Sequence, residues 1–208
     1  KTKIKNISDI FKKTLHQVRT LSESSNSISG ISSGFSKFDK LTSGLQKSDL
    51  IIIAGRPSMG KTTFAMNIAE HNIITTNKPV LIFSMEMPSE QIGMRLLSSL
   101  TKIELQKIRT GNLNENEWKQ IMLKIPSINT KKLFIDDSES LSPLDIRTKA
   151  RKITKEKEQL GIIIIDYLQL MKIQGINENR TYEISEISRS LKSLAKELDV
   201  PLIALSQL

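Results

Sequence analysis

The chain has 208 residues, no cysteine and a formal net charge of +9, a length that suits one domain with a sizeable core and a short appendage. The lack of cysteine excludes a disulfide framework, a cysteine-based zinc site and a thiol nucleophile. The apolar runs are far shorter than the roughly 18 residues of a membrane span, and no signal peptide is visible, so we expect a cytoplasmic protein without a membrane partner. The positive charge is compatible with a nucleic-acid partner but is weak evidence alone.

The first segment has an amphipathic pattern. Its apolar residues recur at spacings of three and four, which predicts a helix: Ile4, Ile7, Phe11, Leu15 and Val18. The polar stretch Leu21–Ser27 predicts a flexible linker, so we expect an appendage over residues 1–29 and a main domain over residues 30–208. A helix tethered in this way packs either on its own domain or on a neighbour, and the pattern favours its own domain slightly.

The stretch Gly55–Thr62, GRPSMGKT, fits the phosphate-binding loop G-x-x-x-x-G-K-S/T at every fixed position. The apolar run Leu50–Ala54 before it predicts a strand buried on both faces, and Thr63–His71 after it predicts a helix. Glycine at both ends of the loop allows backbone angles and a close approach that a Cβ would block, so successive N–H groups can point at phosphate oxygens. The predicted nucleotide-binding residues of this loop are Gly55, Ser58, Met59, Gly60, Lys61, Thr62 and Thr63.

Two residues of the loop have more specific roles. Lys61 is expected to reach the β- and γ-phosphates, and the hydroxyl of Thr62 to bind Mg²⁺. The expected ligand is therefore ATP with Mg²⁺. The alternative, a glycine turn before an ordinary helix, is disfavoured because the strand, the loop and the helix are all present.

Further strands and helices alternate along the chain. Pro79–Ser84 predicts a second buried strand, and Pro88 begins a helix. Thr101 and Glu104 have the spacing of a capping box for a short helix. A helix from near Asn114 to Pro126 carries apolar residues that we expect in the core: Trp118, Ile121, Met122 and Ile125.

The second half of the chain continues the alternation. Leu133–Asp136 predicts a third strand, and Ser142 begins a helix with a basic face, either simply solvated or in contact with nucleic acid. Ile162–Asp166 predicts a central parallel strand whose carboxyl end holds an acid. We interpret Asp166 as the Walker B acid that supports Mg²⁺ together with Thr62.

The chain ends with an exposed loop at Lys172–Arg180, a long helix, and a strand at Pro201–Leu205 that delivers Gln207 to the edge where Asp166 lies. This order predicts an α/β domain with a mostly parallel sheet covered on both faces. Hydrolysis of ATP also requires a base that orients water. Glu86, the acid at the end of the second strand, is the predicted base, unless it only caps the following helix.

These motifs together resemble the C-terminal ATPase domain of the DnaB-type replicative DNA helicase, preceded by its linker helix. The resemblance covers nearly the whole chain and rests on these segments: Gly30–Leu45, GRPSMGKTTFAMN from Gly55, FSMEMPSEQ from Phe83, IRTGNL from Ile108, IDYLQL from Ile165, NRT from Asn179, EISRSLK from Glu186 and ALSQL from Ala204.

The resemblance implies a RecA-like P-loop core that acts as a homo-hexameric ring around single-stranded DNA, moves 5′ to 3′ and unwinds fork DNA. It assigns water activation to Glu86, nucleotide contact to Arg95, and to Gln207 a sensor role that couples the γ-phosphate to DNA-binding loops. It also implies primase and a helicase loader as partners, and docking of the segment Lys1–Leu21 on the adjacent subunit.

The family's arginine finger and main DNA loop follow the strand that ends at Leu208, so we expect a fragment that binds ATP weakly and hydrolyses it poorly by itself. Two alternatives remain. A RecA-type recombination or repair ATPase shares the core and the roles of Glu86 and Asp166, but pairs strands. A non-catalytic module would use bound ATP only to order an assembly.

Overall fold

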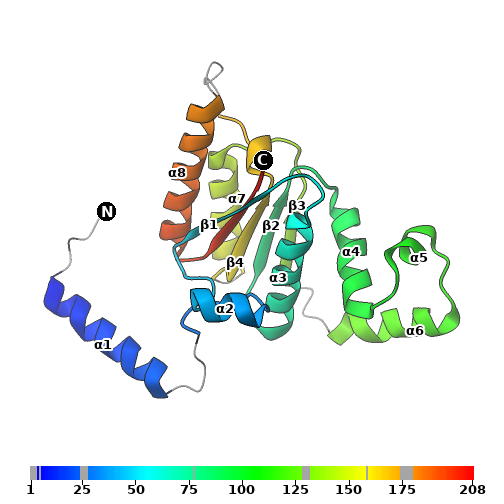
Figure 1. Ribbon diagram of the computed structural model, residues 1–208, viewed down its shortest axis with the longest axis horizontal. Helices are drawn as coiled ribbons and strands as arrows, with labels where there is room; N and C mark the ends of the chain where they lie inside the picture. The colour runs from blue at the N-terminus through cyan, green and yellow to red at the C-terminus, as the bar shows by residue number, and fades with distance from the viewer. Residues whose placement is uncertain are drawn as a thin grey trace.

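A computed structural model describes residue 4 and residues 6–23, 28–76, 78–127, 132–157, 159–173 and 180–208. These residues contain one five-stranded parallel sheet with helices on both faces (Figure 1). The strands lie in the order β1-β5-β4-β2-β3 and are β1 (Leu50–Gly55), β2 (Val80–Ser84), β3 (Leu133–Asp136), β4 (Ile162–Asp166) and β5 (Leu202–Gln207). The prediction of an α/β domain with a parallel sheet is confirmed.

The helices connect these strands in the predicted alternation. They are α1 (Ile7–Glu23), α2 (Ser36–Thr42), α3 (Lys61–Thr75), α4 (Ser89–Thr101), α5 (Leu105–Thr110), α6 (Glu115–Lys124), α7 (Pro143–Glu156) and α8 (Arg180–Leu198), with the single 3-10 turns η1 (Ile125–Ser127) and η3 (Leu168–Leu170). None of the helices in the described ranges is long and apolar enough to cross a membrane.

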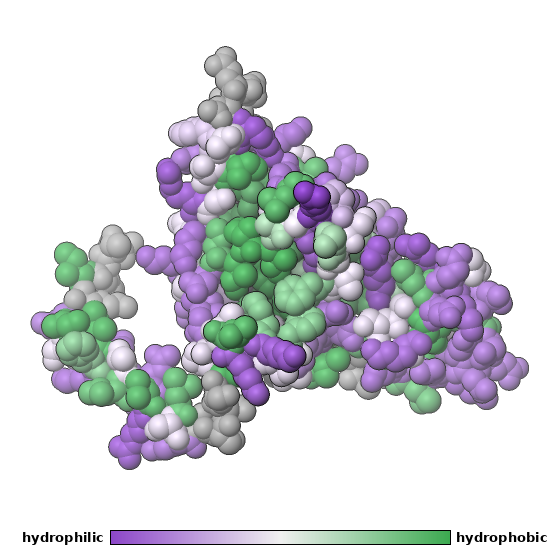
Figure 2. Space-filling model, viewed as in Figure 1, coloured by the Kyte–Doolittle hydropathy of each residue, from purple (hydrophilic) through white to green (hydrophobic). Residues whose placement is uncertain are grey.

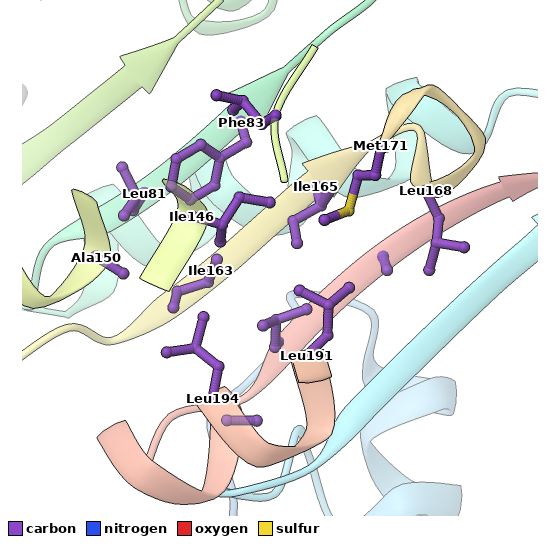
Figure 3. Packing of buried hydrophobic residues seen from close by; sticks show 14 of the residues in the cluster. Leu81, Phe83, Ile146, Ala150, Ile163, Ile165, Leu168, Met171, Leu191 and Leu194 are labelled. Carbon is purple, nitrogen blue, oxygen red and sulfur yellow. The ribbon is translucent and has the colours of Figure 1, made fainter. Parts of the chain in front are cut away.

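Two apolar layers hold the sheet between its helices, because successive side chains of a strand point to opposite faces. One layer joins the sheet to α7 and α8 through Phe83, Ile163 and Leu191, among others (Figure 3). The other joins it to α3 and α4 through Ile82, Ile164 and further side chains. Every residue of β4 is buried, so the prediction that it is a central strand is confirmed.

Strand β1 lies at the edge of the sheet among the described strands. Ile52 is 46% exposed, and Ile51 and Ile53 are only half-buried. Figure 2 shows an apolar area in the middle of the face in view, where Figure 1 shows β1. The prediction of a strand buried on both faces was wrong, because an apolar run does not determine a strand's place in the sheet order.

Helix α1 forms as predicted from Ile7, with Ile4 before it, but none of its residues is buried. Its apolar stripe faces solvent, with Phe11 60% and Leu15 69% exposed, and Figure 1 shows the helix standing apart from the sheet. The pattern's slight preference for packing on its own domain was therefore wrong. Residues 24–27, within the predicted linker, lie outside the described residues.

Helix α6 packs mainly on α4, and its expected core residues are largely exposed. Ile121 is buried, but Trp118 is 47% and Met122 62% exposed. The predicted capping box at Thr101 was also wrong, since Thr101 lies inside α4 and its hydroxyl donates to the carbonyl oxygen of Leu97 at 2.7 Å. A helical period identifies an inner stripe but not how much of the molecule covers it.

Candidate active site

The carboxyl ends of four neighbouring strands meet around one cleft of about 600 Å³. In the parallel register Gly55 lies opposite Gln207, and Ser84 lies opposite Asp166. The cleft is lined by most of the residues that the sequence predicts for the nucleotide site: Ser58, Gly60, Lys61, Thr62, Thr63, Glu86, Arg95 and Gln207. Of the remaining predictions, Asp166 lies beneath Thr62, whereas Gly55 and the exposed side chain of Met59 do not line the cleft.

The loop between β1 and α3 has the backbone that an anion cradle requires. Gly60 has a φ of 84° and Ser58 a φ of 61°, both in the left-handed region. This conformation costs a residue with a Cβ about 1 kcal/mol, a cost that glycine avoids. At Gly55 a Cβ would lie 3.6 Å from Cδ of Lys61, an ordinary contact. The backbone angle therefore explains glycine at position 60, whereas contacts within the chain give no steric reason for glycine at position 55.

Lys61, the first residue of α3, is 6% exposed. Its Nζ donates to the carbonyl oxygens of Gly55 at 2.7 Å and Arg56 at 2.8 Å, and lies 5.6 Å from the centre of the Tyr167 ring. The ammonium is thus held on the loop by two carbonyls and an aromatic face, an attractive arrangement for a cation. A phosphate in the cleft would meet this positive charge directly.

Thr62 and Asp166 form the polar centre of the site. The hydroxyl of Thr62 donates to Oδ2 of Asp166 at 3.0 Å, and Asp166 is 1% exposed. Burial raises the pKa of Asp166 to about 6, with the hydrogen bond from Thr62 opposing the rise and the charge of Glu86 adding to it. Oδ1 of Asp166 is buried and has no hydrogen-bond partner within the described structure. A buried carboxylate oxygen in this state is a ready ligand for a cation or its water.

Glu86 projects from the turn after β2, where two contacts fix the backbone. The N–H of Met85 donates to the carbonyl oxygen of Asp166 at 2.8 Å, and the hydroxyl of Ser84 donates to the carbonyl oxygen of Met87 at 2.7 Å. Glu86 lies at the exposed wall of the cleft. The carboxylate is therefore accessible to water while its main chain is tied to the buried Asp166.

Arg95 reaches the cleft from α4, whose first turn is held by the carboxylate of Asp137 accepting from the N–H of Ser89 at 2.9 Å. Nε of Arg95 is buried without a hydrogen-bond partner in the residues that the structure covers. A buried donor without a partner costs about 1–3 kcal/mol. Arg95 and Asp166 thus each keep one unsatisfied polar atom, as expected for a site built to receive a ligand.

Several neighbours of the site carry no role in the sequence prediction. Tyr167 and Gln91 line the cleft, and Gln169 contacts the main chain of Gln207. The position of Tyr167 directly after Asp166 is a signal that could have identified it. Burial raises the pKa of Tyr167, the hydrogen bond with Thr62 opposes the rise, and that with Glu86 adds to it. Gln169 has no comparable signal, because its contact depends on the path of the chain after β4.

A parallel sheet, a phosphate-binding loop after its edge strand β1 and a carboxylate at the end of the central strand β4 define a RecA-like P-loop ATPase domain. Within that class, the chain belongs to the DnaB-like helicase C terminal domain family, whose model matches residues 30–208. The predicted family resemblance is confirmed.

Curated relatives carry the same family name. The chain is 53% identical over 207 residues to the replicative DNA helicase DnaB of Pasteurella multocida, covering 98% of this chain and 44% of the relative. It is 51% identical to that of Haemophilus influenzae, again over 207 residues, 98% of this chain and 44% of the relative. The chain thus spans less than half the length of these curated relatives.

Solved structures show the same fold. One described as an ATPase domain superposes with a TM-score of 0.89 and 32% identity, over 99% of this chain and 72% of that chain. A DnaB-like replicative helicase, solved in a study of its interactions with primase, gives a TM-score of 0.84 and 33% identity, over 99% and 49% of the two chains.

Proposed function

We propose that this chain is the ATPase core of a replicative DNA helicase, which hydrolyses Mg²⁺–ATP to move 5′ to 3′ along single-stranded DNA and to unwind the fork. The observation that carries the proposal is the hydrogen bond from Thr62 to the buried Asp166, whose Oδ1 has no partner among the described residues, beside Lys61 in a cleft of nucleotide size. Membership of the DnaB-like family supports DNA as the substrate.

The residues present fit ATP and Mg²⁺. The N–H groups of the loop and Lys61 would hold the phosphates, Thr62 and Asp166 would support Mg²⁺, and Arg95 would contact the nucleotide. The described residues contain no cluster of three or more His, Cys, Asp or Glu side chains that could hold a metal by themselves. Mg²⁺ usually keeps several waters and is bound by only one or two protein side chains together with the substrate phosphates. The small ligand set present here therefore suits it.

Bound ATP supplies the phosphoanhydride whose cleavage yields the free energy for movement. Glu86 would orient a water and accept its proton, because it is the carboxylate on the open wall of the cleft, whereas Asp166 is buried under Thr62. Gln207, at the end of β5, would sense the γ-phosphate. The division of roles follows from access, since the exposed carboxylate meets water and the buried one supports the metal.

The proposed partners are single-stranded and fork DNA, five further copies of the chain in a ring, primase and a helicase loader. The exposed apolar stripe of α1 supports docking of this helix on an adjacent copy, since none of its residues is buried in its own chain. The solved relative whose interactions with primase were studied supports primase as a partner.

The test is displacement of a labelled strand from a forked duplex by the full-length protein, with Glu86→Gln as the critical variant. We expect unwinding only on a fork with a 5′ single-stranded tail, and Glu86→Gln to bind ATP normally but to lose turnover by about 10²-fold or more. Glu90→Gln, the same change at an exposed position outside the cleft, is the matched control.

Other outcomes identify other functions. Hydrolysis with strand pairing but no displacement would indicate a recombination or repair ATPase. Nucleotide-dependent assembly that is unchanged in Glu86→Gln would indicate a non-catalytic module. Lys61→Ala weakens ATP binding under all three functions and therefore does not discriminate between them.

A further inference from the structure

We propose that Gln169 is a positioning residue of the cleft, whose carboxamide holds the main chain of Gln207 so that the Gln207 side chain faces the nucleotide. The inference rests on the proposed function, in which Gln207 senses the γ-phosphate. Gln169 itself does not line the cleft and acts through Gln207.

The side-chain amide of Gln169 forms the hydrogen bonds that a neighbouring strand would form with the end of β5. Oε1 of Gln169 accepts from the N–H of Gln207 at 3.2 Å, and Nε2 donates to the carbonyl oxygen of Gln207 and to the hydroxyl of Ser206, both at 2.8 Å. The ladder between β4 and β5 ends at the pair Ile165–Ala204. Beyond that pair the side-chain amide of Gln169 takes the place of a strand, because its carbonyl oxygen and its NH2 group present an acceptor and a donor side by side, as a peptide group does.

On its other side the end of β5 meets the phosphate-binding loop. Gln207 lies opposite Gly55, and the N–H of Leu208 donates to the carbonyl oxygen of Gly55 at 3.2 Å. That same carbonyl accepts from Nζ of Lys61 at 2.7 Å. The main chain of Gln207 is therefore held between the loop that would bind the phosphates and the amide of Gln169.

Gln169 is itself fixed. It lies in η3, between the buried Leu168 and the exposed Leu170, and its carbonyl oxygen accepts from Nη2 of Arg180. Arg180 is paired with Glu183, which is 7% exposed and accepts from the N–H of Ile173 at 2.8 Å. A rigid support matters here, because a side chain that senses one phosphate has to be held to within about 0.5 Å.

Without the amide of Gln169, the exposed end of β5 would keep hydrogen bonds on the β1 side only. Strand ends held from one side fray, and Gln207 would then sample several orientations. Binding of the nucleotide as a whole depends mainly on the loop and Lys61, so we expect Gln169 to affect the response to the γ-phosphate much more than overall affinity.

The test compares Gln169→Met, which keeps the size of the side chain but forms none of these hydrogen bonds, with Gln120→Met in the full-length protein. Gln120 is the matched control, since its amide also donates to a main-chain carbonyl, that of Thr101 at 2.7 Å, outside the cleft. Steady-state ATPase kinetics give kcat and KM, and binding of ADP and of a non-hydrolysable ATP analogue gives their affinity ratio.

We expect Gln169→Met to lower kcat about 10-fold and to reduce the preference for the ATP analogue over ADP, with KM changed by less than about 3-fold. Gln120→Met should change none of these values. The double variant Gln169→Met/Gln207→Ala should be no worse than Gln207→Ala alone, because residues that act through one another are not additive.

Unchanged kcat and affinity ratio in Gln169→Met, or additive losses in the double variant, would overturn the inference while leaving the proposed function intact. If Gln169→Met lowers Tm by more than about 5 °C, the same kinetic and binding measurements are made on Gln169→Asn instead. This variant keeps the amide, but its side chain is one methylene too short to reach Gln207. A wild-type protein that does not bind ATP would overturn the proposed function, and the inference with it.

Discussion

The hydroxyl of Thr62 donates a 3.0 Å hydrogen bond to Oδ2 of Asp166, joining the first turn of α3 to the end of β4 across 104 residues of sequence. The second carboxylate oxygen, Oδ1, is buried and unpaired within the described part of the chain. Burial of this carboxylate therefore has a free-energy cost of desolvation, which a bound cation would offset.

The first prediction concerns the pH dependence of stability. Because the pKa of Asp166 is raised from 3.8 in the unfolded chain to about 6, the native state binds the proton more tightly, and stability falls as pH rises between these values. One pKa unit corresponds to about 1.4 kcal/mol, so the loss is about 3 kcal/mol, complete above about pH 7. Asp166→Asn lacks this loss.

Urea denaturation without nucleotide, at several values of pH from 4 to 8, measures the effect. The free energy of unfolding of Asp166→Asn relative to wild type should rise by about 3 kcal/mol over this range. A difference that stays constant with pH would contradict the raised pKa. Thr62→Val, which keeps the carboxylate, should retain a pH dependence of the same sign.

The second prediction concerns the segment before β1. Asp39 is 3% exposed and accepts from the hydroxyls of Ser32 at 2.7 Å and Ser33 at 2.6 Å and from the N–H of Ser33. Burial opposes its ionisation, but these hydrogen bonds outweigh burial and lower its pKa. Its stabilising contribution is therefore complete above about pH 4 and is lost as pH falls through the lowered native pKa.

We expect Asp39→Asn to lower the free energy of unfolding by about 1–3 kcal/mol at pH 7, because the amide presents a donor to groups that are themselves donors. The difference from wild type should shrink below about pH 4. The control is Asp9→Asn, an exposed change on α1 that should have an effect below about 0.5 kcal/mol. Equal effects of the two substitutions would count against the buried network.

The third prediction separates the centre of the sheet from its edge. Ile164 in β4 is fully buried, whereas Ile52 in β1 is 46% exposed. Ile164→Ala should cost about 2–5 kcal/mol, because it removes buried methyl groups and leaves a cavity. Ile52→Ala, the same change in the same sheet, should cost about 1 kcal/mol or less. Chemical denaturation of both variants measures the contrast, and similar losses would mean that β1 is covered in solution.

The fourth prediction concerns α1. Phe11 is 60% exposed on a helix with no buried residue, so Phe11→Ser should change the free energy of unfolding of a single copy by less than about 0.5 kcal/mol. Because the helix is proposed to dock on an adjacent copy, the same substitution should weaken self-association in analytical ultracentrifugation of the full-length protein. Lys12→Ser is the neighbouring control. An unchanged association constant in Phe11→Ser would exclude docking through this stripe.

Local sequence was sufficient for much of the fold and of the site. The strands Leu133–Asp136 and Ile162–Asp166 have the predicted bounds, and the carboxyl ends of the other strands lie within two residues of those expected. Parallel strands place their carboxyl ends at one edge, so Glu86, Asp166 and Gln207 could be assigned to one cleft before any distance was known. The roles assigned to these residues remain predictions.

Tertiary structure decided what depends on neighbours distant in sequence. The exposure of Ile52 and Trp118 follows from the strand order and from the packing of α6 on α4. The unpaired Oδ1 of Asp166 and the amide of Gln169 beside Gln207 likewise depend on contacts between separate elements. By itself the sequence determined the hydrophobic periodicity of the helices and strands, the phosphate-binding loop and the order of elements, because these are local properties of the chain. Burial, pKa and hydrogen-bond partners were decided only when the sheet assembled, since each depends on which other segments lie within a few ångströms.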